Sequence, residues 1–328
     1  MNQPKKEWLH ISEVYKQGLE YLKGRKEGKI QSIRTPWPTF NEAVMDGLEW
    51  NTITVIAGRP GSGKTLVSDQ ITREAFSLNP NQDFAVLDCQ WEMLPRTMAI
   101  RELSGALKMS MRQLNSTEAA LGEEEFKAAR RYCESKRHLP IFMIESPKTV
   151  PLFERIIEGF CEQHPDKKVM VRIDHSVLFR KDASEQDKFD TLNNLGETLT
   201  RMKKKLPVLF LVLSQLNRNP ETFERLKEGS HGNYLYDSDL YGADALLQHT
   251  DILVMINRPA KYNLKYYGPE QFEVHQDLLA FHFNKVRNGD PRLIFFQAQF
   301  QYMRVQDYPK GFLPPRKPSR VQTIKSLS

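Results

Sequence analysis

The most informative stretch of this sequence is Gly58-Arg59-Pro60-Gly61-Ser62-Gly63-Lys64-Thr65. It follows a β-branched run at residues 52–57 and precedes residues 65–77, whose apolar side chains share one helical face. The pattern G-x-x-x-x-G-K-[ST] between a strand and a helix is typical of a phosphate-binding loop, because its backbone amides and the helix N-terminus both attract anions. We therefore predict that residues 58–65 bind a nucleoside triphosphate, with Lys64 at the β- and γ-phosphates and the Thr65 hydroxyl on Mg²⁺.

Strand-like and helix-like segments alternate along the chain, which predicts an α/β fold whose mostly parallel sheet carries helices on both faces. Beyond the first run, strands are expected at residues 84–89, 141–144, 169–173, 208–213, 252–256, 278–283 and 293–300. A long helical region is expected up to about residue 136. The polar residues 217–247 lack this alternation, and their length predicts a functional loop.

Composition limits the class of protein. Of 328 residues, 40% are hydrophobic and 27% charged, as in an ordinary globular protein. The longest apolar run, residues 206–213, is too short to cross a bilayer, and the first residues lack a secretory signal. Three scattered cysteines have no zinc spacing, so we expect a reduced, cytoplasmic protein without membrane contact. The net charge of +6 permits nucleic-acid binding without identifying it.

The two ends of the chain differ from its middle. Residues 1–36 hold a basic flank and an apolar stripe at helical spacing, made by Trp8, Ile11, Tyr15, Leu19 and Leu22. This stripe must be covered either by its own domain or by a neighbouring subunit. We expect one ATPase-like α/β domain at residues 37–308. The Pro- and Lys/Arg-rich tail at residues 309–328 is expected to be disordered.

Polar side chains at the ends of three predicted strands are candidates for catalysis. Asp174 ends its strand at the sheet edge where ligands bind in such folds, and would hold Mg²⁺. Glu92 would orient or deprotonate the attacking water, although the dipole of a following helix favours a glutamate there by itself. Gln215 would sense the γ-phosphate or simply end its strand. Arg172 is unusual because it interrupts an apolar strand.

Lys285 and Arg287 lie two residues apart on a predicted strand, before the turn Asn288-Gly289. A period of two places both side chains on one face, where two cations repel each other unless they meet an anion. A planar, permanently charged guanidinium is suited to the transition state of phosphoryl transfer. A solvated hairpin edge is the alternative interpretation.

These pieces, in this order, resemble the C-terminal motor domain of hexameric replicative helicases of the DnaB type. The resemblance covers about residues 37–305. Besides the phosphate-binding loop, five stretches resemble motifs of that family. QWEM (90–93) resembles the S-L-E-M motif with the catalytic glutamate, RIDHSVLFR (172–180) resembles the magnesium-aspartate motif, and LSQLNR (213–218) resembles the glutamine sensor. SDLYGADALLQHTD (238–251) resembles the DNA loop, and FNKVRNG (283–289) resembles the K-x-R-N-G motif.

The resemblance implies a RecA-like core with antiparallel strands toward the C-terminus. It implies a homo-oligomeric ring, a hexamer, that hydrolyses ATP with Mg²⁺ between subunits and moves along single-stranded DNA to unwind duplex. One subunit would supply Lys64, Thr65, Asp174, Glu92 and Gln215, and the next would supply Lys285 and Arg287. Arg101 falls where the family has an arginine, and we include it in the nucleotide site. Primase or a loader protein would be further partners.

The chain departs from the family mainly at the DNA loop. Tyr241 and Gly242 stand where the family has Arg-Glu, and Asp244 stands where it has Gly. We expect Tyr241 and the backbone amides of Gly242 and Ala243 to contact DNA, by stacking and by hydrogen bonds to phosphate. Further positive charge would come from two residues after the Asp174 strand, Arg180 and Lys181. His175 also replaces the usual tyrosine of the magnesium-aspartate motif.

These departures leave other interpretations open. The ring could be a RecA-like ATPase with a regulatory or recombination-type role that does not unwind DNA. A scaffold that binds nucleotide without hydrolysis is a third possibility, against which the intact Glu92, Asp174 and Gln215 argue. The family's separate N-terminal domain has no counterpart in the sequence, where residues 7–24 resemble only the interdomain linker. The resemblance therefore does not extend to that domain's roles in forming a collar and binding primase.

Overall fold

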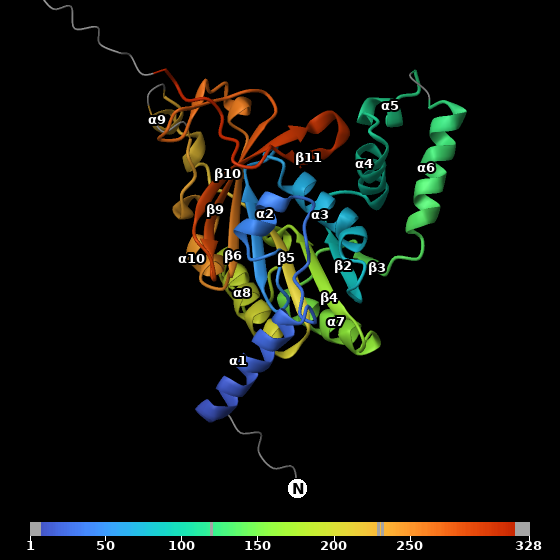
Figure 1. Cartoon of the computed structure of the whole chain (residues 1–328), viewed down its shortest axis with the longest axis vertical. Coiled ribbons are helices and arrows are strands. Elements are labelled where there is room, and N and C mark those ends of the chain that lie inside the picture. Colours follow the sequence, from blue (N-terminus) through green and yellow to red (C-terminus); the bar gives the residue numbers. More distant parts are fainter. Residues whose placement is uncertain (1–7, 119–120, 228–229, 231–232, 319–328) are drawn as a thin grey trace, which may run out of the picture.

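The computed structural model describes residues 8–118, 121–227, 230 and 233–318 (Figure 1). The α-helices in these ranges are α1 (Ile11–Lys26), α2 (Pro38–Ala43), α3 (Lys64–Leu78), α4 (Pro95–Leu107), α5 (Met111–Asn115), α6 (Glu123–Lys136), α7 (Val150–Gln163), α8 (Lys188–Lys205), α9 (Phe223–Leu226) and α10 (Ala243–Leu247). The strands are β1 (Ile53–Gly58), β2 (Phe84–Gln90), β3 (Ile141–Ile144), β4 (Lys168–Asp174), β5 (Val208–Gln215), β6 (Ile252–Asn257), β7 (Tyr266–Tyr267), β8 (Phe272–Glu273), β9 (Leu278–Val286), β10 (Arg292–Gln299) and β11 (Arg304–Asp307).

In the described part of the chain, nine strands form one sheet in the order β11-β10-β9-β6-β1-β5-β4-β2-β3. The strands from β6 to β3 in this order are parallel, whereas β9, β10 and β11 join antiparallel beyond β6. Gly58, the last residue of β1, is level with Gln215 on β5 and Ile256 on β6. The carboxyl ends of the parallel strands therefore meet at one edge. The predicted fold class is confirmed.

Helices cover both faces of the sheet, and each face buries its own apolar layer (Figure 1). On one face α3 packs through Val67 and Ile71, which are fully buried. On the other face α7 and α8 pack through Phe153, Leu195 and Leu199. The central parallel strands β1 and β5 are buried on both faces, which explains why β5 has a continuous apolar run and why β1 is mostly apolar. No helix among the described residues is long and apolar enough to span a bilayer.

Two regions differ from the sequence-based expectation. The long helical region before β3 is divided into α4, α5 and α6, which stand together beside the sheet (Figure 1). Residues 315–317, within the tail expected to be disordered, lie along the short hairpin β7–β8. There Glu273 N–H donates to the Pro315 carbonyl (2.7 Å) and Lys317 N–H to the Gln271 carbonyl (2.9 Å). Residues 319–328 lie outside the described residues.

Helix α1 projects from the body of the molecule (Figure 1). The predicted apolar stripe is uncovered: Trp8, which precedes the helix, is 73% exposed, and within the helix the exposed fractions are 54% for Ile11, 67% for Tyr15, 67% for Leu19 and 63% for Leu22. Within the described residues, the stripe is therefore not covered by its own domain. The alternative, coverage by a neighbouring subunit, remains a prediction.

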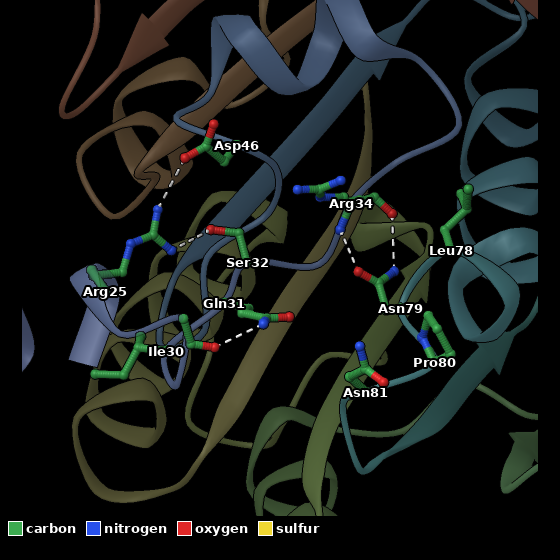
Figure 2. Close-up of a pocket in the computed structure, with 11 residues that line it drawn as sticks. Arg25, Ile30, Gln31, Ser32, Arg34, Asp46, Leu78, Asn79, Pro80 and Asn81 are labelled. Atoms are coloured by element: carbon green, nitrogen blue, oxygen red, sulfur yellow. Dashed lines mark hydrogen bonds and ion pairs between the residues drawn. The ribbon is translucent and has the colours of Figure 1, made fainter.

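The connector after α1 is fastened to the end of α3 around a hollow of about 460 Å³ (Figure 2). Asn79 accepts from the Arg34 backbone N–H (2.8 Å) and donates to the Arg34 carbonyl (3.1 Å). Arg25, at the end of α1, donates to Ser32 Oγ (3.1 Å) and lies 3.5 Å from Asp46. These contacts hold the root of α1 while its apolar face stays exposed.

Candidate functional site

The phosphate-binding loop turns sharply between the end of β1 and the start of α3. Gly61 (φ 77°) and Gly63 (φ 100°) adopt left-handed backbone conformations that side chains other than glycine rarely take. Lys64 then begins α3, and only 7% of its surface is exposed. Burial lowers the pKa of the Lys64 ammonium, while the carboxylates of Glu92 and Asp174 act in the opposite direction. The loop therefore has a turn between a strand and a helix, as expected, and its binding of a nucleotide remains a prediction.

A cleft of about 310 Å³ opens beside this loop. Its lining includes loop residues Gly61, Gly63, Lys64 and Thr65, then Glu92 and Arg101, and from the other side Arg258, Phe300 and Met303. The first six were singled out from the sequence. Asp174 and Gln215 lie on neighbouring strand ends but are not part of the lining.

Asp174 ends β4 and is fully buried. Burial raises the pKa of its carboxyl to about 6, although Arg172 opposes the shift. One carboxylate oxygen, Oδ1, has no hydrogen-bond partner among the described residues. Mg²⁺ is usually held by one or two carboxylates together with phosphate oxygens and water, so this oxygen and the Thr65 hydroxyl fit such an ion.

Arg172, the unusual charge in the β4 strand, proves to be the centre of a buried network. Its guanidinium is 1% exposed and lies 2.9 Å from Asp88 on β2, 2.6 Å from Asp69 on α3 and 3.5 Å from Asp174. Asp69 also pairs with Arg101 on α4 (3.4 Å). Because each buried charge needs an opposite partner, this network fixes the relative positions of α3, α4, β2 and β4 beneath the cleft.

Glu92 and Gln215 are placed by the ends of two other strands. The Trp91 backbone N–H donates to the Asp174 carbonyl (3.3 Å), which holds the turn after β2 against the end of β4 and leaves Glu92 exposed in the cleft. Gln215 is the last residue of β5, so this strand is two residues longer than expected. Its Nε2 lies 3.2 Å from His175 Nε2. The residues that one subunit is predicted to supply for catalysis thus reach the carboxyl edge, and their catalytic roles remain predictions.

One wall of the cleft was not anticipated from the sequence. The Arg258 guanidinium lies over the Phe300 ring, 3.8 Å from its centroid, and Met303 is beside them in the lining. Lys261 donates to the Pro60 carbonyl of the loop (2.6 Å). An aromatic and cationic wall of this kind suits a nucleobase. No motif marks these residues, since Phe300 and Met303 reach the loop only because β10 folds back antiparallel.

Lys285 and Arg287 lie at the opposite, amino edge of the sheet. Lys285 is level with Leu253 on β6, and its Nζ donates to the Leu247 carbonyl (2.7 Å). Arg287 follows β9, and its Nε lies 2.9 Å from the Asp251 carboxylate. Because Asp251 hydrogen-bonds to Ile53 at the start of β1, Arg287 is separated from the end of β1 by about 16 Å of strand. These two cations cannot reach the phosphate-binding loop of their own chain.

The residues proposed to contact DNA lie on two separate segments. Tyr241 is 41% exposed, its N–H donates to the Gln215 carbonyl (2.9 Å), and Gly242 then caps α10, which starts at Ala243. Arg180 and Lys181 are exposed after β4, where the Lys181 ammonium donates to the Gln186 carbonyl (3.0 Å). Tyr241 is thus hydrogen-bonded to the end of β5. DNA contact remains a prediction for Arg180, Lys181, Tyr241, Gly242 and Ala243.

Comparison with known families and structures identifies this arrangement. The model of the DnaB-like helicase C-terminal domain family matches residues 33–307. A solved ATPase domain superposes with a TM-score of 0.78 at 17% identity, covering 92% of this chain and 100% of that one. A DnaB-like replicative helicase, described together with its interactions with primase, superposes with a TM-score of 0.75 at 16% identity, covering 94% of this chain and 69% of that one.

Curated relatives are distant and longer. A probable replicative DNA helicase of Trieres chinensis is 25% identical over 271 residues, which are 81% of this chain and 55% of that protein. A replicative DNA helicase DnaB of Leifsonia xyli subsp. xyli is 24% identical over 283 residues, which are 86% of this chain and 57% of that protein. The chain therefore spans somewhat more than half the length of these relatives.

Proposed function

This chain belongs to the family of DnaB-like helicase C-terminal domains, and from that premise we propose that it is an ATP-dependent DNA helicase motor. It would hydrolyse ATP at the interfaces of a homo-oligomeric ring, a hexamer, and use the energy to move along single-stranded DNA. The observation that carries this proposal is the separation of two charged groups. The residues for binding and hydrolysis converge at the carboxyl edge, whereas Lys285 and Arg287 lie at the amino edge of the same sheet.

Each group at the carboxyl edge has a distinct role in the proposed reaction. Lys64 and the loop amides bind the phosphates, and the exposed Glu92 orients a water molecule toward the γ-phosphate. Asp174 and Thr65 would hold Mg²⁺, which neutralises phosphate charge when bound. Gln215 would detect the γ-phosphate, and Arg258 with Phe300 would contact the base.

Besides Lys64 and Arg101 of the binding subunit, a cation from a neighbouring subunit would stabilise the transition-state charge. Arg287 is 57% exposed at the amino edge and is held by Asp251, so its guanidinium is presented at the surface in a defined orientation. A neighbouring copy could place it, together with Lys285, against the bound nucleotide. Such an arginine commonly accelerates phosphoryl transfer by about 10³-fold or more.

Assembly of the ring is supported by α1. Its apolar stripe, defined above, is exposed in a single chain, and exposed stripes of this kind usually mark a protein interface. We propose that a neighbouring subunit covers it. Primase or a loader protein is a further proposed partner, and a reducing compartment such as the cytoplasm suits Cys89, Cys133 and Cys161, which are unpaired.

The decisive experiment is ATP hydrolysis with and without single-stranded DNA. We expect single-stranded DNA of any sequence to stimulate hydrolysis, because base stacking does not depend on sequence. The stimulation should weaken as the salt concentration rises, with a shallow slope because few phosphates are contacted. Tyr241→Ala should remove most of the stimulation while basal hydrolysis stays nearly unchanged, since Tyr241 lies outside the cleft. Phe126→Ala, which removes an exposed aromatic side chain on α6, is the control. If Tyr241→Ala leaves both the basal and the DNA-stimulated rate of hydrolysis unchanged, Tyr241 does not contact DNA.

The altered DNA loop favours one other candidate function, a RecA-like ring ATPase with a regulatory or recombination-type role. Tyr241 and Gly242 stand at positions where the helicase family carries Arg-Glu, so a phosphate ion pair is lost. A strand-displacement assay separates the two. DNA-stimulated hydrolysis without displacement of the paired strand would favour this alternative.

A further inference from the structure

A side-chain bridge that the proposed reaction does not use joins the phosphate-binding loop to the segment after β5. Arg59, the second residue of the loop, donates from Nη1 to the Leu216 carbonyl (2.8 Å) and from Nη2 to Glu221 Oε2 (2.8 Å). The Tyr262 hydroxyl donates to the other oxygen, Glu221 Oε1 (2.9 Å). Glu221 therefore holds Arg59 on Leu216, and Tyr262 holds Glu221.

The far side of this bridge leads directly to Tyr241. Leu216 and Leu240 form an antiparallel bridge and are both almost fully buried. On one side of that pair Tyr241 N–H donates to the Gln215 carbonyl (2.9 Å), and on the other Asn217 N–H donates to the Asp239 carbonyl (2.7 Å). A short backbone ladder thus connects the residue that Arg59 contacts with the residue proposed to contact DNA.

The bridge is stronger than a surface ion pair. The side chains of Arg59 and Glu221 are only 17% and 27% exposed, and both carboxylate oxygens are engaged. The hydrogen bond from Arg59 lowers the pKa of the Glu221 carboxyl, so the pair is charged at neutral pH. Charge-assisted hydrogen bonds in partly desolvated positions are roughly twice as strong as neutral ones. The bond therefore resists separation of its two ends.

We infer that Glu221 is a positioning residue that couples the nucleotide site to the DNA site. Glu221 keeps Arg59 bound to the Leu216 carbonyl. A shift of the phosphate-binding loop would then shift the Leu216–Leu240 ladder, and a shift of the ladder would shift the loop. The inference rests on the proposed function, because it requires nucleotide at the loop and single-stranded DNA at Tyr241. Coupling between two sites is reciprocal, so it can be measured from either ligand.

The test measures the affinity of the full chain for a fluorescent oligothymidylate. Affinity is compared between ADP and a non-hydrolysable ATP analogue, each with Mg²⁺, and the ratio of the two affinities is the coupling factor. Glu221→Gln keeps the shape of the side chain and removes its charge. We expect it to reduce the coupling factor by at least about threefold, while nucleotide affinity without DNA changes by less than about twofold.

Two further variants bracket this result. Tyr262→Phe removes one of the two bonds to Glu221 and should reduce the coupling factor in the same direction by a smaller amount. Glu224→Gln removes an exposed glutamate three residues away on α9 and should leave it unchanged. The change that DNA causes in affinity for the ATP analogue, divided by the change that it causes in affinity for ADP, must give the same factor for each variant. If Glu221→Gln fails to fold, Tyr262→Phe decides.

The possible failures are distinguishable. An unchanged coupling factor in Glu221→Gln would overturn the inference and leave the proposed function intact. Equal loss of DNA affinity in both nucleotide states would also overturn it, because Glu221 would then be part of the DNA site or of its scaffold. Absence of DNA binding by the unaltered chain would instead remove the proposed function on which the inference rests.

Discussion

The two edges of one sheet differ in whether their charges are satisfied within the chain. At the carboxyl edge, Lys64 is buried beside a cleft and Asp174 keeps one oxygen without a partner among the described residues. At the amino edge, Lys285 donates to a backbone carbonyl and Arg287 pairs with Asp251. The carboxyl edge therefore keeps groups available to a ligand, whereas the amino edge presents two cations that are already positioned. Only a second copy of the chain could bring the two edges together.

Each edge is organised around one buried charged side chain, a guanidinium at the carboxyl edge and a carboxylate at the amino edge. Arg172 lies among Asp69, Asp88 and Asp174 beneath the cleft. Asp251 accepts from the Ile53 backbone N–H (2.8 Å) and pairs with Lys203 and Arg287 at the other edge. A buried charge surrounded by opposite partners fixes several elements at once, because moving any of them leaves a charge unpaired. This explains how both edges present side chains in defined positions.

The largest effect is expected from removing the phosphate contact at the carboxyl edge. Lys64→Ala should lower the rate of ATP hydrolysis by more than about 10³-fold, since a buried cation next to the phosphates is lost. Phosphate release is the measurement. A thermal melt should show that the fold is retained, and Lys265→Ala, an exposed lysine, is the matched control. Turnover near the unaltered rate would show that the cleft is not the site of hydrolysis.

The next prediction asks whether the two edges meet between subunits. Glu92→Gln and Arg287→Ala should each lower turnover by about 10³-fold when assembled alone. Mixed in equal amounts under conditions of subunit exchange, about a quarter of the interfaces would combine an intact Glu92 with an intact Arg287, because in a ring each interface joins unlike surfaces. Turnover should recover to a corresponding fraction.

Assembly of each variant with itself provides the baseline for this mixing experiment. Native mass spectra of differently tagged chains would show whether mixed rings have formed. Mixed rings that remain inactive would contradict a role for Arg287 in the neighbouring site.

A smaller effect is expected at the base of the carboxyl edge. Arg172→Leu leaves the buried Asp88 without its partner and should lower the free energy of unfolding by about 3–5 kcal/mol. The double variant Arg172→Leu/Asp88→Leu also removes the Asp88 carboxylate and should recover only part of this loss, because Asp174 still lacks the guanidinium and Asp69 keeps only Arg101. Urea unfolding followed by circular dichroism measures both. If the single variant is as stable as the unaltered chain, the network does not hold these elements together.

The smallest effect is a pH dependence of the Mg²⁺ site. Because burial raises the pKa of Asp174 to about 6, its carboxyl takes up a proton as the pH falls through this value, and a protonated carboxyl cannot bind Mg²⁺. Lowering the pH from about 7.5 to about 5.5 should therefore weaken the Mg²⁺-dependent part of nucleotide binding by about fourfold. A fluorescent ATP analogue titrated with Mg²⁺ gives this quantity.

Asp174→Asn isolates the contribution of the nucleotide, whose own phosphates also take up protons in this range. In this variant, the pH dependence of nucleotide binding should come only from protonation of the nucleotide's phosphates. An identical pH profile in the variant and the unaltered chain would contradict the assignment of Asp174 to the metal.

The local chemistry of the carboxyl edge was predictable because it is encoded in short stretches. The phosphate-binding loop needs glycines at fixed spacing, and each strand that ends beside it is a run of apolar residues followed by a polar side chain. Asp174 could therefore be selected from the strand pattern, whereas Glu92 and Gln215 were selected with the help of the family resemblance, and all three roles remain predictions. The limits of α4, α5 and α6 were missed, since helix breaks within a polar region depend on which short faces find a packing surface.

The sequence by itself determined the order of the parallel strands' segments along the chain, the phosphate-binding loop and the charged pair after residue 283, since these depend on neighbouring residues and on the periodicity of each element. Only the tertiary structure decided which distant residues share a surface. It placed Phe300 and Arg258 against the loop, Arg172 among three carboxylates and Arg287 at the edge away from its own cleft. The physical reason is that strand order and the antiparallel return of β9 and β10 are set by burial of both sheet faces at once, a property of the whole chain that no single segment carries.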